Sequence, residues 1–249
     1  MHLLITGATG RVGSRYVRRL LQRGDEVRLL VRQPERAESL RQLGAEVAVG
    51  DLCQPETLRP AVAGVDAVVH LAAFFRGATA AETEAVNHDG TLSLARAAIE
   101  AGVPRFLFSS TNLVYGPGRG RAAREDDVPQ PAGAYAASKA AAEAALLELH
   151  QSQGLDLRML RLAFVYGEAD PHLTEGLQWF RTWHPQKRFQ MVHHADVAQA
   201  LLLATDAPGI EGRIYNVAED EPTTTAELMH LLGEPIAADA ATRPMADPW

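Results

Sequence analysis

The chain has 249 residues, of which 47% are hydrophobic and 22% are charged, as in a soluble globular protein with one sizeable domain. Its formal net charge of −7 gives no support to binding of nucleic acid or of an anionic membrane surface. The single cysteine, Cys53, excludes an internal disulfide and fits a reducing compartment, and we interpret it as a packing residue.

The amino end gives no sign of targeting, because the first turn-forming glycine already stands at position 7. No apolar run approaches the ~20 residues that span a bilayer. We therefore expect a cytoplasmic protein without a membrane partner.

Residues 2–13, HLLITGATGRVG, organise the rest of the chain. A short apolar run predicts a buried strand, which runs into Gly7, Gly10 and Gly13 and then into a helical pattern. Glycines at such a turn allow a close approach of the backbone to a pyrophosphate, and the following helix points its free N–H groups at the phosphates. A purely structural turn is the alternative, since the spacing is G-x-x-G-x-x-G and not G-x-G-x-x-G.

The remaining segments alternate between the periods of strands and helices. Further strands are predicted over 26–32, 46–50, 66–70, 105–110, 155–164 and 213–217. Helices are predicted over 34–43, 56–63, 79–102, 134–151 and 196–205, the last with Asp196 as its N-cap, and a surface loop over 116–131. This alternation predicts an α/β fold with a doubly wound parallel sheet of about seven strands.

Ligands of such sheets bind beyond the carboxyl ends of the strands. Several candidate ligand-binding residues follow predicted strand ends and should converge on one crevice: Gly7, Arg32, Asp51, Leu71 to Ala73, and Ser109 to Thr111.

Two stretches, 167–195 and 219–249, fall outside the repeating pattern. The first has the densest aromatic content of the chain. We interpret both stretches as a small substrate-binding cap on a nucleotide-binding domain formed by 1–166 and 196–218.

Tyr135 and Lys139 form the pattern Y-x-x-x-K on the predicted helix 134–151. At a spacing of four residues the two side chains share one helix face. A free tyrosine has a pKa of about 10, and an adjacent ammonium lowers it toward the range of an acid–base catalyst. The same pattern is common as a surface pair, so its meaning depends on Ser109, Ser110 and Thr111 at the end of the preceding strand.

Taken in order, the motifs resemble the extended short-chain dehydrogenase/reductase family, specifically its NAD-dependent epimerase/dehydratase group. The matching motifs are TGATGRVG (6–13), GDL (50–52), HLAA (70–73), Asn87 in NHDGT, FLFSSTNLVYG (106–116), YAASK (135–139), RLAFVYG (161–167) and HHADVA (193–198). The match covers about 1–218. It implies a Rossmann-type fold and an oxidoreductase that moves hydride between the nicotinamide of NAD(P) and a sugar, a nucleotide-sugar or a small carbonyl or alcohol substrate.

The resemblance also implies roles for single residues. Tyr135 would be the catalytic acid–base, Lys139 would lower its pKa and hold the nicotinamide ribose, and Thr111 would contact the substrate. Asn87 would be a polar support of the site. The cofactor would be bound by Gly7, Thr9, Gly10, Arg11, Val12, Gly13, Arg32, Asp51, Leu52, Leu71, Ala72, Ala73, Ser109, Tyr135 and Lys139.

Arg32 bears on the choice of cofactor. NAD-binding enzymes generally have an acidic residue at the end of the second strand, which binds the ribose 2′-OH. Here the chain has Arg32, with Arg36 one turn further on. Cations suit a 2′-phosphate, so NADP(H) is favoured over NAD(H), the alternative being that Arg32 stacks on adenine and accepts either cofactor.

Other functions are less well supported. His193, His194 and Asp196 resemble a metal site, but Asp196 is needed as a helix cap, and we predict no metal. A non-catalytic regulator that senses NADP(H), or a domain with degenerate chemistry, would not need both Tyr135 and Lys139. Little chain remains beyond residue 217, which puts a full nucleotide-sugar in doubt. The resemblance also allows a homodimer through helices 79–102 and 134–151.

Overall fold

In the computed structural model, residues 1–75, 77–118 and 120–243 are described; position 119 of the predicted loop and positions 244–249 of the predicted cap lie outside them. Seven strands form one parallel sheet in the order β10-β6-β5-β4-β1-β2-β3. The strands are β1 (His2–Thr6), β2 (Glu26–Val31), β3 (Glu46–Val49), β4 (Ala67–His70), β5 (Arg105–Thr111), β6 (Asp156–Leu162) and β10 (Arg213–Val217). The predicted doubly wound sheet is confirmed.

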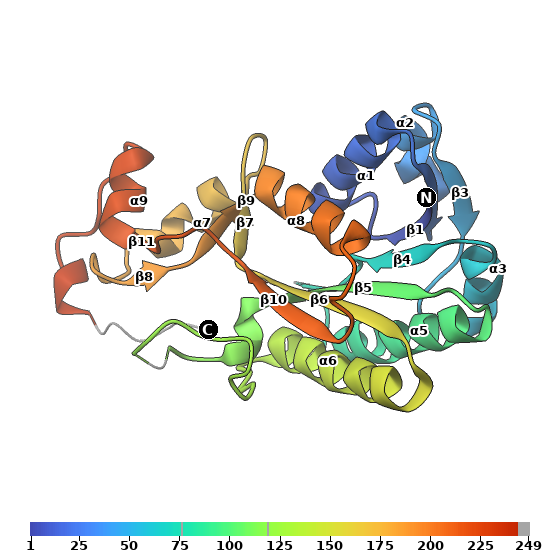
Figure 1. The fold of residues 1–249 in the computed structure, drawn as a ribbon. Helices are drawn as coiled ribbons and strands as arrows, with labels where there is room; N and C mark the ends of the chain where they lie inside the picture. The colour runs from blue at the N-terminus through green and yellow to red at the C-terminus, as the bar shows by residue number, and fades with distance from the viewer. Residues whose placement is uncertain (76, 119, 244–249) are drawn as a thin grey trace.

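Helices cover both faces of this sheet (Figure 1). Helices α1 (Arg11–Arg23), α2 (Glu38–Arg41) and α8 (His194–Asp206) lie on one face, and α3 (Leu58–Val62), α5 (Gly90–Glu100) and α6 (Ala134–Gln153) on the other. Successive residues of a strand point to opposite faces, so Leu3 and Ile5 join the core under α1 and α8, whereas Leu4 joins the core over α5 and α6. The continuous apolar strands in the sequence follow from burial on both faces.

The predicted helix 79–102 is built from three pieces. Helix α4 (Ala80–Glu84) starts with a capping box between Thr79 and Glu82, a π-helical turn follows at Ala85–Asp89, and α5 continues the chain. The π turn turns Asn87 inward, where its side chain is fully buried. Such turns inside helices are frequent at functional sites.

Short 3-10 turns complete the connections: Pro34–Ala37, Pro55–Thr57, Asn112–Tyr115 and Ala240–Thr242. Two local predictions are wrong. Helix α8 starts at His194, and its cap is His193, whose Nδ1 accepts a hydrogen bond from the Ala195 N–H; Asp196 lies in the first turn instead. Cys53 is exposed and does not pack in the core, because the turn after β3 directs it outward.

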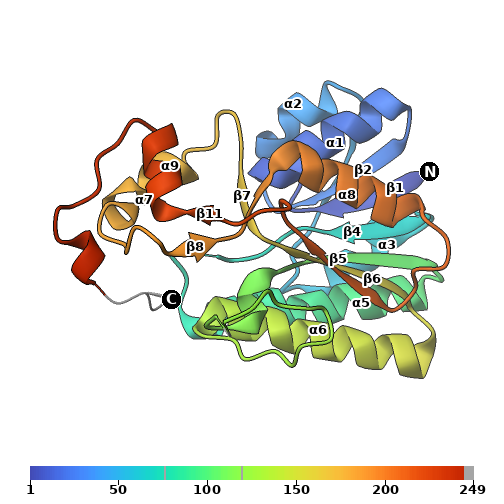
Figure 2. The same ribbon diagram turned by 60° about the vertical axis from the view of Figure 1, so that its left-hand side comes forward.

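The described residues 167–195 and 219–243, here called the cap, come after β7 (Phe164–Tyr166) and β10 in the chain. In the views of Figures 1 and 2 the cap lies at one end of the sheet. Its elements are α7 (His172–Phe180), β8 (Arg188–Phe189), β9 (Met191–His193), β11 (Thr223–Thr224) and α9 (Thr225–Leu231). β9 pairs with β7 (Phe164–Tyr166), and β8 pairs with β11.

The cap has its own small apolar core, formed by Phe180, Met191, Leu228 and Met229. None of the helices in the described part of the chain is long and apolar enough to cross a membrane.

Candidate functional site

The glycine-rich turn after β1 is packed too closely for side chains. Gly7 has φ +68°, and a Cβ on it would lie 2.6 Å from the backbone nitrogen of Ala72. A Cβ on Gly13 would lie 2.2 Å from the carbonyl oxygen of Gly7. The turn is therefore pressed against the segment after β4 and against the first turn of α1, as a backbone cradle requires.

The amino end of α1 is open to an anion. Its N-cap is Gly10, which has no side chain to accept a hydrogen bond from the first turn, and that turn contains no acidic residue. The free N–H groups and the positive end of this 13-residue helix together favour a phosphate. These are the features that a bound pyrophosphate needs.

A pocket opens beside this turn along the carboxyl ends of β1, β2, β3 and β4. Nine of the predicted cofactor-binding residues line it: Gly7, Thr9, Gly10, Arg32, Asp51, Leu52, Leu71, Ala72 and Ala73. It is also lined by residues that the sequence analysis did not assign to it, including Gln33, Phe74 and Val86. The position of Phe74 directly after the Leu71–Ala73 run was the available signal.

Three predicted cofactor-binding residues have other contacts here. The side chain of Arg11 pairs with Asp170 of the cap at 3.0 Å, and Val12 packs against the core under α1. Gly13 serves the packing of α1 against Gly7. Ser109, Tyr135 and Lys139 lie outside the lining of this pocket, further along the sheet toward β5 and α6.

Two cations stand at the β2 end of the pocket. Arg32 and Arg36 are both exposed and both line it. The Arg32 guanidinium carbon lies 5.4 Å from the centre of the Phe74 ring. A smaller hollow beyond Arg32 is lined by Gly50, Asp51 and neighbouring residues. An added negative group would therefore meet two arginines here.

Thr111 ends β5 and is largely buried, with its Oγ1 accepting a hydrogen bond from the N–H of Leu113 at 3.3 Å. Ser110 is buried beside it, and Ser109 is half-buried. The three hydroxyl residues therefore stand at the carboxyl edge of the sheet, as predicted.

Tyr135 lies in the first turn of α6, and burial raises the pKa of its hydroxyl to about 12. Lys139 is 2% exposed, and its Nζ lies 3.8 Å from the centre of the Phe108 ring. Burial lowers the pKa of Lys139 to about 7, partly opposed by the charge of Glu143. In this structure the pKa of Tyr135 is raised, contrary to the sequence prediction, because desolvation of the phenol outweighs any effect of the ammonium.

Asn87 connects the pocket wall at Phe74 to helix α6 through hydrogen bonds. Its Oδ1 accepts a hydrogen bond from the Phe74 N–H at 2.7 Å, and its Nδ2 donates to the Phe74 carbonyl at 2.9 Å. The same Nδ2 donates to Ser138 Oγ at 3.0 Å, and Ser138 donates to the carbonyl oxygen of Tyr135 at 2.8 Å. An unbroken chain of hydrogen bonds thus runs from the pocket wall to the residue predicted to be catalytic.

His70 is fully buried between two threonines, with hydrogen bonds to Thr6 at 2.6 Å and to Thr91 at 2.8 Å, so both of its ring nitrogens have partners. Tyr115 is buried and donates to Asn216 at 2.7 Å. Tyr115 therefore combines a packed ring with a polar contact.

His193 and His194 meet Glu168, not Asp196. Their nearest ligand atoms lie within 4.8 Å of one another. Glu168 Oε2 is 2.7 Å from His194 Nε2 and 3.4 Å from His193 Nε2. Because Nδ1 of His193 accepts the helix-cap hydrogen bond, the neutral ring carries its proton on Nε2, which faces the carboxylate. The imidazole rings of His193 and His194 therefore both face the Glu168 carboxylate with their Nε2 atoms.

A parallel sheet with an anion-binding turn after β1, and with hydroxyl groups, a tyrosine and a lysine at the same edge, defines a Rossmann-type, dinucleotide-dependent oxidoreductase. The chain belongs to the NAD dependent epimerase/dehydratase family, whose model matches residues 3–218. It is an enzyme of the extended short-chain dehydrogenase/reductase type, as its relatives are.

Relatives of known activity include a ketoreductase of Stigmatella aurantiaca that acts on a 4-farnesyl-dihydroquinoline oxide, 32% identical over 246 residues, which cover 94% of this chain and 73% of the relative. The dTDP-glucose 4,6-dehydratase of Streptomyces griseus is 31% identical, and the match covers 96% of this chain and 79% of that enzyme. Among solved structures, UDP-glucose 4-epimerase of Thermus thermophilus in complex with NAD has a TM-score of 0.79 at 31% identity, with 95% and 85% of the chains covered. The dTDP-glucose 4,6-dehydratase of Streptomyces venezuelae with NAD has a TM-score of 0.80 at 28% identity, and the match covers 94% of this chain and 82% of that structure.

Proposed function

We propose that this enzyme reduces a carbonyl substrate with a nicotinamide cofactor held between the glycine-rich turn and the ends of β2 to β4. When bound, the cofactor supplies the hydride. Tyr135 would give its phenolic proton to the substrate oxygen, and the Thr111 hydroxyl would donate a hydrogen bond to the same oxygen. Lys139, one turn along α6, would hold a ribose hydroxyl with its Nζ.

The observation that carries this proposal is the hydrogen-bonded chain from Phe74 through Asn87 and Ser138 to Tyr135. It couples the wall of the cofactor pocket to the proton donor, so that both are held in one geometry. Such positioning is what hydride transfer between two bound groups requires.

The protonated state of Tyr135 supports the reductive direction. With the pKa of this residue raised to about 12, its hydroxyl is protonated near neutrality, which is the form that donates a proton to a carbonyl oxygen. A nucleotide-sugar epimerase or dehydratase would instead begin by removing a proton from an alcohol, and would regenerate its cofactor within one cycle. Steady consumption of NADPH that matches product formation would support a reductase, and retention of the cofactor redox state would contradict it.

For the cofactor we propose a preference for NADP(H) over NAD(H), based on Arg32 and Arg36 beside the pocket. The solved relatives cited above contain NAD, which is the competing choice. A titration of the purified protein with NADPH and NADH, followed by nicotinamide fluorescence, tests this. We expect Arg32→Asp to weaken NADPH binding by about tenfold to a hundredfold and to leave NADH binding within a few-fold. Tight NADH binding to the unmodified protein would contradict the preference.

Replacement of Tyr135 by Phe separates an enzyme from a regulator that only senses the cofactor. We expect turnover to fall by about 10²- to 10⁴-fold while NADPH affinity is retained. Full retention of turnover would exclude Tyr135 as the proton donor.

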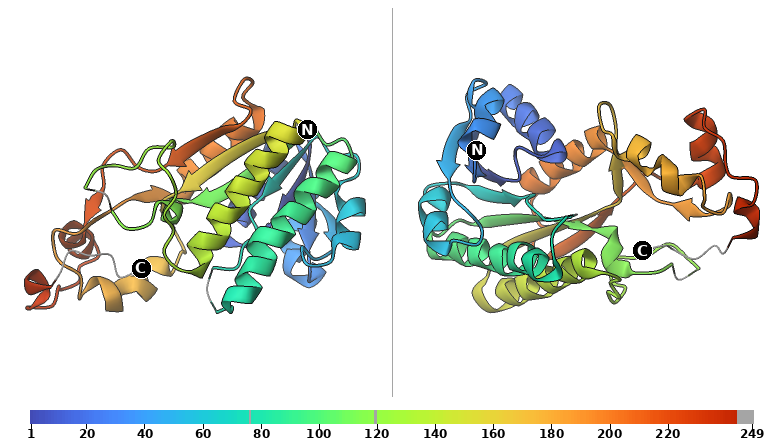
Figure 3. Two further views of the ribbon diagram at one scale, coloured as in Figure 1. Left: turned by 90° about the horizontal axis from the view of Figure 1, so that it is seen from below. Right: turned by 180° about the vertical axis from the view of Figure 1, so that it is seen from behind.

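We further infer that residues 167–195 and 219–249 act as the substrate-binding part, and that two copies of the chain pair through α5 and α6. These helices lie side by side on one face of the sheet (Figure 3). Analytical ultracentrifugation tests the pairing, since a purely monomeric species at micromolar concentration would exclude it.

A further inference from the structure

Phe75 stands beside Tyr135 in a way that bears on the substrate. The centres of the two rings are 4.7 Å apart, and the ring planes meet edge to face at 72°. Phe75 is nonetheless 46% exposed, although it is a large apolar side chain. An aromatic ring that contacts the proposed proton donor and is itself partly exposed stands where a substrate that reaches Tyr135 can meet it.

Single exposed apolar residues are common on protein surfaces and carry no meaning by themselves. Phe75 differs from such isolated residues because hydrogen bonds hold the backbone of the preceding residue, Phe74, in place. Both polar backbone atoms of Phe74 are bonded to the buried side chain of Asn87, and Asn87 is linked through Ser138 to the carbonyl of Tyr135. The Phe75 ring is therefore anchored next to a segment that is itself fixed to the helix carrying Tyr135, which is how a preorganised contact is built.

The charges of the cap agree with an apolar substrate. The cap contains three arginines and one lysine, Lys187, which is buried with its Nζ 4.0 Å from the centre of the Trp183 ring. Arg181 pairs with Glu234, and Arg243 pairs with Asp239 at 2.9 Å, so two of the three are engaged with carboxylates of the cap itself. Arg188, in a two-residue strand, is the third. A nucleoside diphosphate needs several cations or free N–H groups to replace its hydration, and two of these arginines are already neutralised.

From these observations we propose that Phe75 is a specificity-determining residue, and that the substrate is a carbonyl compound with an aromatic or other apolar group next to the reacting carbon, not a nucleotide-sugar. This rests on the reductase function proposed above. The apolar group would lie on the exposed part of the Phe75 ring while the carbonyl oxygen meets Tyr135. Stacking of this kind is worth about 0.5–1.5 kcal/mol beyond the buried area, so its loss together with that area corresponds to about tenfold in kcat/KM.

A matched pair of α-keto esters tests the proposal. Ethyl benzoylformate and ethyl pyruvate have the same reacting group and differ only in a phenyl or a methyl group beside it. We expect the unmodified enzyme to prefer ethyl benzoylformate by about tenfold or more in kcat/KM, and Phe75→Ser to reduce that preference to about twofold, with the change mainly in KM. Phe75→Leu should retain part of the preference, and Leu203→Ser, at an exposed position on α8, should retain all of it.

Three outcomes would overturn the proposal: an unchanged preference in Phe75→Ser, no preference in the unmodified enzyme, or a higher kcat/KM for dTDP-glucose than for ethyl benzoylformate. Saturation-transfer NMR of ethyl benzoylformate on the NADPH-bound protein gives a readout without turnover. Contacts of the phenyl protons that disappear in Phe75→Ser would support the role of Phe75 even if no reduction occurred, in which case the reductase function alone would fail. Absence of such contacts would reject the apolar substrate class, whatever the activity.

Discussion

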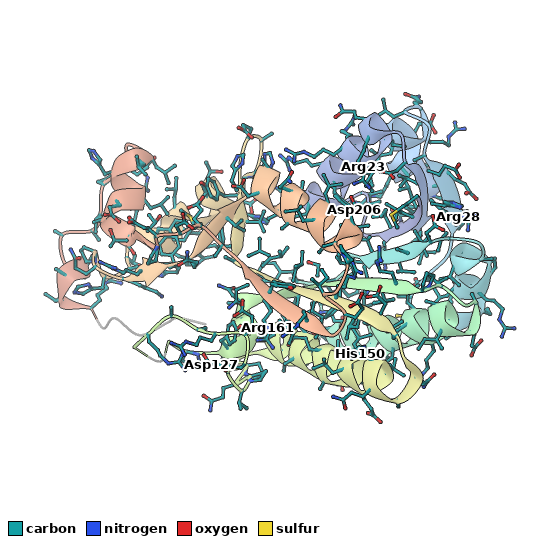
Figure 4. All side chains as sticks on the ribbon, viewed as in Figure 1. Arg23, Arg28, Asp127, His150, Arg161 and Asp206 are labelled. Carbon is teal, nitrogen blue, oxygen red and sulfur yellow. The ribbon has the colours of Figure 1, made fainter. Side chains whose placement is uncertain are left out.

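Arg161 and Glu143 form an ion pair inside the protein: Nη2 of Arg161 lies 2.6 Å from Oε2 of Glu143, and each side chain is 3% exposed. Arg161 also donates to the Tyr115 hydroxyl at 2.8 Å and to the carbonyl oxygen of Glu125 at 3.1 Å. Arg161 lies on β6, near the loop that contains Asp127 (Figure 4). The pair thus joins β6 and this loop to α6, two turns beyond Tyr135.

Removing one member of this pair should be costly. In Glu143→Gln the guanidinium of Arg161 stays buried without a counter-charge, and we expect the free energy of unfolding to fall by about 3–5 kcal/mol. Urea unfolding measures this. The double variant Glu143→Leu, Arg161→Met replaces both charges with apolar groups, and should be more stable than Glu143→Gln alone. A double variant as unstable as the sum of the two single replacements would mean that the residues act independently.

The sheet and the pocket beside β1 could be predicted because their signals are local. Short apolar runs mark the strands, which are four to seven residues long. The rule that ligands bind at the carboxyl ends of parallel strands places Gly7, Arg32 and Asp51 at one crevice, and all three line the pocket. Both predictions, of the sheet and of the pocket, require only the order of strands and helices along the chain and no knowledge of how side chains pack.

Contacts between distant segments could not be predicted. Glu168 reaches His194 only because the loop after β7 folds over the start of α8, and His193 displaces Asp196 as the cap there. The pKa of Tyr135 depends on how much of its ring is desolvated, which no sequence pattern reveals. Phe75 likewise gains its meaning from a ring contact across sixty residues of sequence.

Burial of His70 should make stability depend on acid pH. Burial, with a smaller effect of the Lys139 charge, lowers the pKa of His70 from 6.5 to about 3. Below pH 6.5 the unfolded chain therefore binds a proton that the folded protein does not. The stabilisation is complete above pH 6.5 and is lost as the pH falls toward 3, at about 1.4 kcal/mol per pH unit.

Urea unfolding of the protein and of His70→Gln between pH 4 and 8 measures this effect. The stability difference between the two should shrink as the pH is lowered. His230→Gln, at an exposed position on α9, is the matched control and should leave the pH dependence unchanged. A constant difference for His70→Gln would mean that His70 takes up its proton equally in both states.

Lys139 should have the corresponding effect at alkaline pH. Its pKa is lowered from 10.5 to about 7 in the folded protein, chiefly by burial. Between pH 7 and 10.5 the unfolded chain retains a proton that the folded protein has released, so this residue makes stability rise with pH across that window, at about 1.4 kcal/mol per unit. Lys139→Met should remove the rise when unfolding is followed from pH 7 to 9.5. A variant with the same slope as the unmodified protein would assign the rise to other groups.

Gly13 allows the close packing at the glycine-rich turn to be tested directly. A Cβ at this position would lie 2.2 Å from the Gly7 carbonyl oxygen and 2.8 Å from the Ala8 Cα, so in Gly13→Ala the first turn of α1 must move away from the turn after β1. We expect the free energy of unfolding to fall by about 1–3 kcal/mol because of this overpacking. The higher helix propensity of alanine acts in the opposite direction and by itself would stabilise the variant by up to ~1 kcal/mol.

The same displacement should weaken NADPH binding by about tenfold or more, because the N–H groups of α1 would no longer point at the position of the pyrophosphate. Gly118→Ala is the matched control, since a Cβ there meets no atom within 4 Å. Urea midpoints and fluorescence titrations compare the two variants. If Gly13→Ala bound NADPH as tightly as Gly118→Ala, the phosphates would have to lie elsewhere than at the start of α1, and the cofactor site proposed beside Gly7 and Gly10 would be wrong.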